Sequence, residues 1–393
     1  MIKIRLLPAL LLISVSCQAQ NVVRFLIEAL PSYNSSSSEI YIAGSFNGWN
    51  SQNKNFQFNK DEKGDYSLDL KLGNGSYEYK ITRGGWGKVE CRENGSDIAN
   101  RILKVDGNAT VQINIEGWKD HFPSVALQRK HTAGPTVHII DTAFLIPQLN
   151  RTRRIWVYVP AEYETSNKSY PVLYMHDGQN LFDDATSYAG EWGVDECLDT
   201  MKYKCIVVGI DNGGNKRLNE YCPYDFSLTG IGANASSNKG EGDQYVDFLV
   251  KTLKPFIDKS YRTLKDKEHT YIAGSSMGGL ISMYAVLKYP DIFGGVGVFS
   301  PAFWVAPKIF DDIKEKGTKV HAKIYFYAGG SESATMVPDM VKAHNEMMKA
   351  SKPVSNFVST VDNNAMHNET AWRKVFPLFY LWITENRFYD LKN

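Results

Sequence analysis

The sequence has few cysteines and no excess of either charge. It contains 5 cysteines among 393 residues, and neither a CxxC spacing nor clustered histidines accompany them, so nothing predicts a metal site or another cofactor. Lys and Arg total 44 and Asp and Glu 43, for a net charge of +1. A chain of this balance lacks the cationic surface that nucleic acids attract, and we expect no nucleic-acid partner. The pattern neither requires nor excludes a disulfide.

Long apolar runs are scarce as well. The most pronounced one, residues 6–15, follows a basic start and is too short to span a bilayer, which is typical of a signal peptide over residues 1–19. Small residues follow this run, and we expect cleavage after Ala19. Cys17 leaves open the alternative of a lipid anchor, and with it the type of signal peptidase. Either way, the sequence predicts an exported protein, periplasmic or extracellular, with no membrane span.

The rest of the chain has two parts with different patterns. In residues 20–125, short alternating segments are separated by turn residues, which predicts a small antiparallel sandwich of the immunoglobulin-like type. Residues 126–135 are polar and are expected to form a linker. From 136 to 393, short apolar strands alternate with helical stretches, which predicts a doubly wound α/β domain. The strands are expected at 39–43, 66–72, 77–81, 110–115, 172–175, 205–210, 271–273, 295–299, 323–327 and 357–361. Helices are expected at 244–259, 277–288 and 337–349.

The motif Gly274-Ser-Ser-Met-Gly278 has the G-x-S-x-G pattern of a nucleophile elbow. An apolar strand is predicted before it and a helix after it, as this turn requires. The flanking glycines leave space for a strained backbone at Ser276. Its hydroxyl is then expected at the carboxyl end of the sheet, over a helix N-terminus that favours a developing anion. An incidental serine in a tight turn is the alternative.

A serine nucleophile needs a histidine base and a carboxylate that orients it, and α/β-hydrolases order them serine, acid, histidine. Three histidines follow Ser276, and His367 is the one placed in a polar loop after a predicted strand. His321 precedes a strand and His344 falls within a predicted helix. The loop after the strand at 323–328 contains Glu332, our candidate acid, with Asp339 as the alternative.

The oxyanion that forms during acyl transfer needs two backbone donors. We expect one to be the amide of Met277. The other is expected from the loop 176–180, where Gly178 allows close approach and Gln179 supplies the amide. His176, beside this loop, is expected to lie near the substrate and to hydrogen-bond structurally rather than act as a second base.

Residues 136–390 resemble the esterase D-like esterase family, which includes feruloyl and acetylxylan esterases, enterochelin esterases and mycolyltransferases. The matching segments are Tyr170–Asn180, Gly190–Glu196, Gly274–Gly279, Ser300–Trp304 and His367. The resemblance implies an α/β-hydrolase fold and a serine triad, and Trp192 and Trp304 in the matching segments are expected to contact substrate. Many members carry aspartate where this chain has Glu332, so the acid departs from the family pattern.

The N-terminal part resembles the glycogen- and starch-binding-like immunoglobulin modules, through Ile42–Trp49 and Tyr77–Trp86. In binding members two tryptophans stack on sugar rings beside a lysine, which implies a glycan site at Trp49, Trp86 and Lys80. The spacing between lysine and tryptophan is one residue short here, and a packing role without binding is the alternative.

The sequence therefore predicts a serine carboxylic ester hydrolase that deacylates carbohydrate or aryl esters. Hydrolysis of a siderophore ester on the same machinery is a first alternative. A glycan-binding surface protein with an inactive hydrolase domain is a second, and the intact order of Ser276, Glu332 and His367 argues against it. The acyl and alcohol parts of the substrate are not fixed by these residues, and neither is the oligomeric state.

Overall fold

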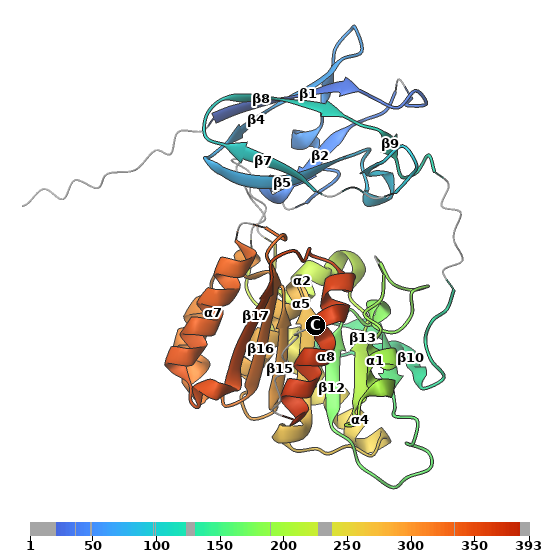
Figure 1. Ribbon diagram of the computed structural model, residues 1–393, viewed down its shortest axis with the longest axis vertical. Coiled ribbons are helices and arrows are strands. Elements are labelled where there is room, and N and C mark those ends of the chain that lie inside the picture. Colours follow the sequence, from blue (N-terminus) through green and yellow to red (C-terminus); the bar gives the residue numbers. More distant parts are fainter. Residues whose placement is uncertain are drawn as a thin grey trace, which may run out of the picture. The chain divides into compact units, whose positions relative to one another are not determined.

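The computed structural model describes residues 21–122, 130–226 and 238–385, apart from the single positions 36, 48, 97, 99, 189 and 334. The predicted signal peptide and Cys17 lie outside the described residues. The described residues fall into two compact units, which we call unit 1 (21–122) and unit 2 (130–226 and 238–385) (Figure 1). In the described part of the chain, no helix has both the length and the apolar character needed to cross a membrane.

Unit 1 is made of short strands and turns. Two small sheets share one apolar core, to which each sheet contributes alternate residues such as Phe25 and Leu70 from one and Ile81 from the other. The strand order is β3-β4-β1-β8 in one sheet and β2-β5-β7 in the other, with a separate β6-β9 pair. Their bounds are β1 Asn21–Ala29, β2 Tyr41–Gly44, β3 Asn59–Lys60, β4 Tyr66–Leu72, β5 Gly75–Thr82, β6 Glu90–Cys91, β7 Arg101–Val105, β8 Ala109–Asn114 and β9 Gly117–Trp118.

The pairing in unit 1 differs from the expected one in a single respect. β1 pairs antiparallel with β4 but parallel with β8, so the sheet is mixed rather than purely antiparallel. β1 begins the unit and β8 lies near its end, and strands that are distant in sequence are not constrained to a hairpin. The prediction of a two-sheet β unit agrees with the structure; the finer immunoglobulin-like assignment stays a prediction.

Unit 2 contains an eight-stranded sheet in the order β10-β11-β13-β12-β14-β15-β16-β17. The strands from β13 to β17 pair in parallel, whereas β10 and β11 form an antiparallel edge. This confirms the predicted α/β-hydrolase class. The bounds are β10 Val137–Ile146, β11 Arg151–Tyr158, β12 Val172–His176, β13 Ile206–Ile210, β14 Thr270–Ser275, β15 Gly295–Phe299, β16 Lys323–Gly329 and β17 Phe357–Asp362.

Helices cover both faces of this sheet. Successive residues of β16 point to opposite faces: Tyr325 contacts Phe379 of α8, and Phe326 contacts His344 of α7. Figure 1 shows α8 lying across the strands. The α-helices are α1 Val194–Thr200, α2 Arg217–Tyr221, α3 Gly242–Phe248, α4 Lys254–Ser260, α5 Met277–Lys288, α6 Ile309–Lys316, α7 Met336–Ala350 and α8 Glu369–Glu385.

Short helical turns lie between the other elements of both units, and one of them interrupts a predicted helix. The stretch 244–259 is divided into α3 and α4 by a π turn, η6 Leu249–Leu253. The remaining turns are η1 Ser45–Asn47, η2 Lys54–Phe56, η3 Trp86–Lys88, η4 Gly178–Asn180, η5 Gly214–Lys216, η7 Lys267–His269, η8 Phe303–Val305, η9 Gly317–Lys319 and η10 Val354–Asn356.

Candidate active site

Ser276 stands between the end of β14 and the first residue of α5. Its backbone has φ 59° and ψ −120°, a conformation that L-residues other than glycine rarely adopt. Three backbone bonds hold it there. The Ser276 amide donates to Phe299 O at 2.9 Å, and its carbonyl accepts from Leu280 at 3.1 Å and from Ala302 at 3.0 Å. The surroundings therefore impose a strained turn that presents the hydroxyl at the carboxyl end of the sheet.

Two glycines of the motif are required by close backbone approach. A Cβ on Gly274 would lie 2.9 Å from Gly278 C and 2.9 Å from the ring of His176. A Cβ on Gly279 would lie 2.9 Å from Phe299 O. Neither residue could be alanine without moving the strand or the helix, so these glycines keep the elbow compact.

His367 and Glu332 meet above this edge of the sheet. His367 lies in the loop between β17 and α8, and its Nδ1 is 2.7 Å from Glu332 Oε2. The glutamate is buried, while the imidazole is 37% exposed and can reach a ligand. Within the described chain, Ser276 Oγ makes no hydrogen bond, so the structure does not join the serine directly to His367. Such catalytic contacts often tighten only when substrate is bound.

The second oxygen of Glu332 is held by groups that sequence reasoning missed. Oε1 accepts hydrogen bonds from Ser300 Oγ at 2.6 Å and from the Gly329 amide at 2.5 Å. Trp372 in turn donates its indole N–H to Ser300 Oγ at 2.9 Å, and its ring lies edge-on to His367. Ser300 has a positive φ of 42°, a conformation unusual outside glycine. No pattern in the sequence indicated that its hydroxyl would contact Glu332.

Two backbone amides near Ser276 have no acceptor. In the described part of the chain, neither the Met277 nor the Gln179 amide donates a hydrogen bond. The loop that carries Gln179 packs against the elbow, because a Cβ on Gly278 would lie 3.3 Å from His176 Cβ and 3.5 Å from Asp177 Oδ2. Two unpaired backbone donors, one on the elbow and one on the loop packed against it, are what an oxyanion hole needs.

His176 is buried under this loop. Its Nδ1 pairs with the Tyr245 hydroxyl at 3.0 Å, and its Nε2 has no partner among the described residues. Burial lowers the pKa of His176 to about 4, so the ring is neutral at physiological pH. The structure thus places it behind the site, as a packing and hydrogen-bonding residue, rather than in contact with a substrate.

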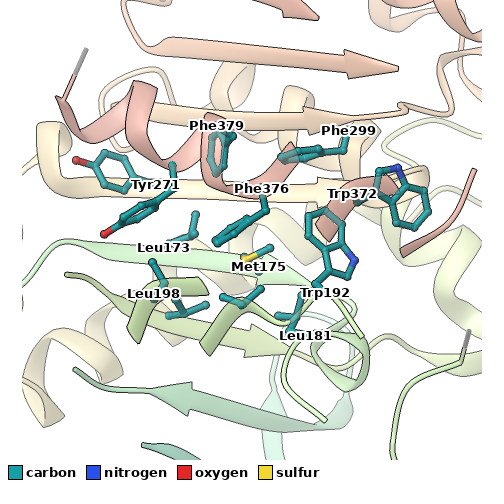
Figure 2. Close-up of a cluster of buried hydrophobic side chains, with 14 of the residues drawn as sticks. Leu173, Met175, Leu181, Trp192, Leu198, Tyr271, Phe299, Trp372, Phe376 and Phe379 are labelled. Carbon is teal, nitrogen blue, oxygen red and sulfur yellow. The ribbon is translucent and has the colours of Figure 1, made fainter. Parts of the chain in front are cut away.

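The two tryptophans expected at the substrate lie in different surroundings. Trp192 is only 2% exposed and stacks on Trp372 at 5.7 Å, with Leu181 in the same core cluster (Figure 2). Its ring offers no free face to a ligand, so we correct our expectation and assign it to the core behind the site. Trp304 is 42% exposed and lies two residues after Ala302, whose amide donates to the Ser276 carbonyl, so its ring remains available to a substrate.

Three carboxylates of unit 2 hold the segment just before β10. The pairs are His131 Nδ1 with Asp183 at 2.7 Å, Thr132 Oγ1 with Glu191 at 2.9 Å, and the Gly134 amide with Asp195 at 2.9 Å. All three carboxylates are buried. Burial raises the pKa of Asp195 to about 7 and raises the pKa of Glu191. Part of the stretch expected as linker is therefore hydrogen-bonded to unit 2.

In unit 1, the predicted glycan residues are only partly brought together. The rings of Trp49 and Trp86 lie 6.1 Å apart at 44°, and Trp86 is 37% exposed. Trp49 is half-buried and has a positive φ of 60°. Lys80 donates to the carbonyl of Ile98 at 2.6 Å. The tryptophans thus form a pair, while the lysine amine is engaged with the backbone.

The family match to known proteins falls within unit 2. The Esterase family, described as "Putative esterase", matches residues 146–380. The uncharacterized protein YbbA of Bacillus subtilis (strain 168) is 24% identical over 241 residues, which is 59% of this chain and 92% of YbbA. An endo-1,4-beta-xylanase/feruloyl esterase of Xylanibacter ruminicola is 25% identical over 224 residues, which is 56% of this chain and 27% of that protein.

A solved structure matches most of the chain. The enterobactin esterase FES from Shigella flexneri superposes with a TM-score of 0.50 and 15% identity, over 94% of each chain. At this identity the likeness speaks for the fold alone.

Proposed function

The chain belongs to the Esterase family and is a carboxylic ester hydrolase, and we propose that it works through an acyl-enzyme formed on Ser276. The observation that carries the proposal is the 2.7 Å contact between His367 Nδ1 and Glu332 Oε2, together with the strained backbone of Ser276. A carboxylate on Nδ1 fixes the tautomer that leaves Nε2 free to accept a proton.

The reaction proceeds in two balanced halves. Ser276 Oγ bonds to the acyl carbon while His367 Nε2 takes its proton, and the carbonyl oxygen becomes an oxyanion that the Met277 and Gln179 amides bind. The intermediate collapses, and the alcohol leaves with the proton from His367. Water then attacks the acyl-enzyme with His367 as base, which releases the carboxylic acid and restores the serine. Glu332 stabilises the imidazolium in both halves without taking the proton.

Carbohydrate or aryl esters are our proposed substrates. Trp304 supports this, because an exposed indole near the serine can stack on an aryl or sugar ring. The name of the Xylanibacter ruminicola relative includes feruloyl esterase, whereas the Shigella flexneri structure is an enterobactin esterase, so a siderophore ester is the alternative. Turnover of feruloylated and acetylated oligosaccharides beside a catecholate siderophore would separate the two.

The nucleophile is tested by Ser276→Ala. We expect the rate on p-nitrophenyl acetate to fall by about 10⁴ to 10⁶, and a fluorophosphonate to label the wild type but not the variant. Ser282→Ala is the control, because this serine lies on the same helix with its hydroxyl bonded to Gly278 O at 2.7 Å. Residual activity of Ser276→Ala within about tenfold of wild type would refute the assignment.

Export and domain organisation are part of the proposal. We propose a signal peptide over residues 1–19, a carbohydrate-binding-type module over 20–125 and a hydrolase domain that reaches residue 393. The sequence motifs of the N-terminus support export to the periplasm or beyond. Mass measurement of the mature N-terminus would distinguish cleavage after Ala19 from acylation at Cys17.

A second function, glycan binding by unit 1, is favoured by one observation. Trp49 and Trp86 form a ring pair with one member exposed, an arrangement that can pack against a sugar. Lys80 would have to release the Ile98 carbonyl to contact a glycan, so we propose that the tryptophans carry the binding.

A further inference from the structure

An ion pair between Arg217 of α2 and the buried Asp177 holds the loop that carries the free Gln179 amide. We propose that Arg217 is a positioning residue, which acts through Asp177 to hold the Gln179 N–H where the oxyanion forms. This inference rests on the proposed function, because it takes that amide to be an oxyanion donor. It assigns a role to a side chain outside the serine, histidine and glutamate set.

Asp177 is the residue that turns the chain from β12 into η4, and it adopts the left-handed conformation with φ 57°. Arg217 fixes it with two parallel bonds, from Nε to Oδ1 at 2.7 Å and from Nη2 to Oδ2 at 2.9 Å. The Asp177 amide also donates to the Tyr221 hydroxyl at 3.3 Å. A non-glycine residue in this conformation persists only where its surroundings hold it, and here α2 supplies both partners.

Further hydrogen bonds hold the rest of the loop. Asn212 donates its side-chain amide to Asp177 Oδ1 at 2.7 Å and its backbone amide to Gln179 Oε1 at 3.2 Å. Thr186 Oγ1 donates to the Gln179 carbonyl at 2.7 Å. A Cβ on Gly178 would lie 2.8 Å from the backbone of β13, so the loop cannot move inward. In the described chain, the Gln179 backbone N–H and its side-chain Nε2 are the donors of that residue left to bind a ligand.

The contact depends on the shape of the guanidinium as well as its charge. A planar fork fixes both carboxylate oxygens, whereas an ammonium makes a single, rotatable contact. Arg217→Lys therefore keeps the charge opposite Asp177 but loosens the carboxylate, whose Oδ1 keeps the bond from Asn212 while Oδ2 loses its fixed partner. Because catalysis falls steeply with small displacements of an oxyanion donor, this change should affect the transition state more than substrate binding.

Unit 1 offers a matched control. Arg101 holds Glu90 with its Nε and Nη2 at 2.8–3.1 Å, and the exposed fractions of that pair (27% and 1%) resemble those of Arg217 and Asp177 (25% and 8%). Arg101→Lys should perturb stability in a similar way without touching the loop. A second test variant, Asp177→Asn, keeps a side chain that tolerates positive φ but removes the charge.

The experiment measures kcat/KM on p-nitrophenyl acetate and the inhibition constant of phenylboronic acid, whose serine adduct is tetrahedral like the intermediate. For Arg217→Lys and Asp177→Asn we expect kcat/KM to fall about 10- to 100-fold, and the boronate constant to rise by a similar factor. Arg101→Lys should leave both values within about twofold of wild type. Thermal unfolding of each variant accompanies the kinetics.

Gln179→Pro, which lacks the amide hydrogen, completes a double-mutant cycle. If Arg217 acts through that amide, Arg217→Lys should cost little further activity in the Gln179→Pro background. Full additivity, or a wild-type-like Arg217→Lys in an active enzyme, would overturn the role of Arg217 alone. A wild-type protein that hydrolyses no ester and takes up no fluorophosphonate would instead overturn the proposed acyl-enzyme, and this role with it.

Discussion

The Ser300 hydroxyl donates a 2.6 Å hydrogen bond to Glu332 Oε1, on the carboxylate oxygen opposite the one that faces His367. Ser300 also follows directly on Phe299, whose carbonyl accepts the Ser276 amide. The backbone at the end of β15 therefore contacts the proposed nucleophile, and the next side chain contacts the proposed acid. A displacement of this segment would disturb both groups together.

Glu332→Gln should lower kcat less than His367→Ala does. The glutamine removes the charge that stabilises the imidazolium, for an expected loss of about 10² to 10⁴, whereas loss of the base costs about 10⁴ to 10⁶. Steady-state kinetics on p-nitrophenyl acetate compare the two. Asp339→Asn, on α7, is the control and should retain activity. If Asp339→Asn abolished activity and Glu332→Gln left it unchanged, the acid of the triad would be Asp339 and not Glu332.

Ser300→Ala should weaken both activity and stability. It leaves the buried Glu332 with one donor fewer on Oε1, a loss of about 1–3 kcal/mol in unfolding free energy. We expect kcat to fall with little change in KM, because the glutamate and not the substrate loses its partner. Trp372→Phe removes the donor to Ser300 while Glu332 keeps both donors on Oε1, so its effect on kcat should be smaller. Its stability is not compared, because the smaller ring also loses packing on Trp192. Equal losses of kcat in the two variants would argue against this chain of bonds.

Much of the fold could be predicted, because buried parallel strands and their helices leave strong patterns. The expected strand 295–299 coincides with β15 and the helix 277–288 with α5, and both are almost wholly buried. The edge strand β10 was missed. Most of its residues are exposed, so its sequence carries no regular alternation of apolar and polar residues.

The candidate residues of the site could be predicted where the order of serine, acid and histidine along the chain identifies them. The structure brings His367 next to Glu332. The loops that carry them lie at the carboxyl ends of neighbouring parallel strands. Long-range partners such as Ser300, Trp372 and Arg217 could not be identified, since no local pattern records a contact between distant side chains. Trp192 was misplaced for a related reason. The residues on either side of it, Glu191 and Gly193, give no apolar pattern, and the aromatic residues that bury it come from β15 and α8.

Asp195 should make stability depend on pH near neutrality. Its pKa is about 7 in the folded chain, against about 3.9 for an exposed aspartate, so the folded state binds more protons between these values. The stability that this group contributes is present at low pH and is lost as the pH rises towards 7. Asp195→Asn should remove a slope of at most about 1.4 kcal/mol per pH unit.

Chemical denaturation from pH 5 to pH 8 measures this slope for wild type and Asp195→Asn. The two curves should diverge as the pH rises, with the wild type the less stable at pH 8 relative to pH 5. The exposed Asp291→Asn variant should follow the wild type. Parallel wild-type and Asp195→Asn curves would contradict the raised pKa.

Trp86→Ala and Trp49→Ala should each weaken glycan binding if unit 1 binds sugars. Loss of either ring removes half of the pair, and the more exposed Trp86 should matter more. Affinity electrophoresis in glycogen, amylopectin and xylan gels measures the retardation. Lys80→Met should change it little, since the Lys80 amine contacts the Ile98 carbonyl. No retardation of the wild type in any gel would leave unit 1 with a packing role.

The bonds from His131, Thr132 and Gly134 to buried carboxylates bear on how the hydrolase unit can be isolated. A fragment that starts at residue 136 removes the donors of Asp183, Glu191 and Asp195 and leaves their oxygens to be satisfied by water. Glu191 and Asp195 lie one and three residues from Trp192 in sequence, and Trp192 packs on Trp372. A truncation made at the apparent edge of the domain would thus reach the indole that supports Ser300, and a fragment that begins at or before residue 130 avoids this.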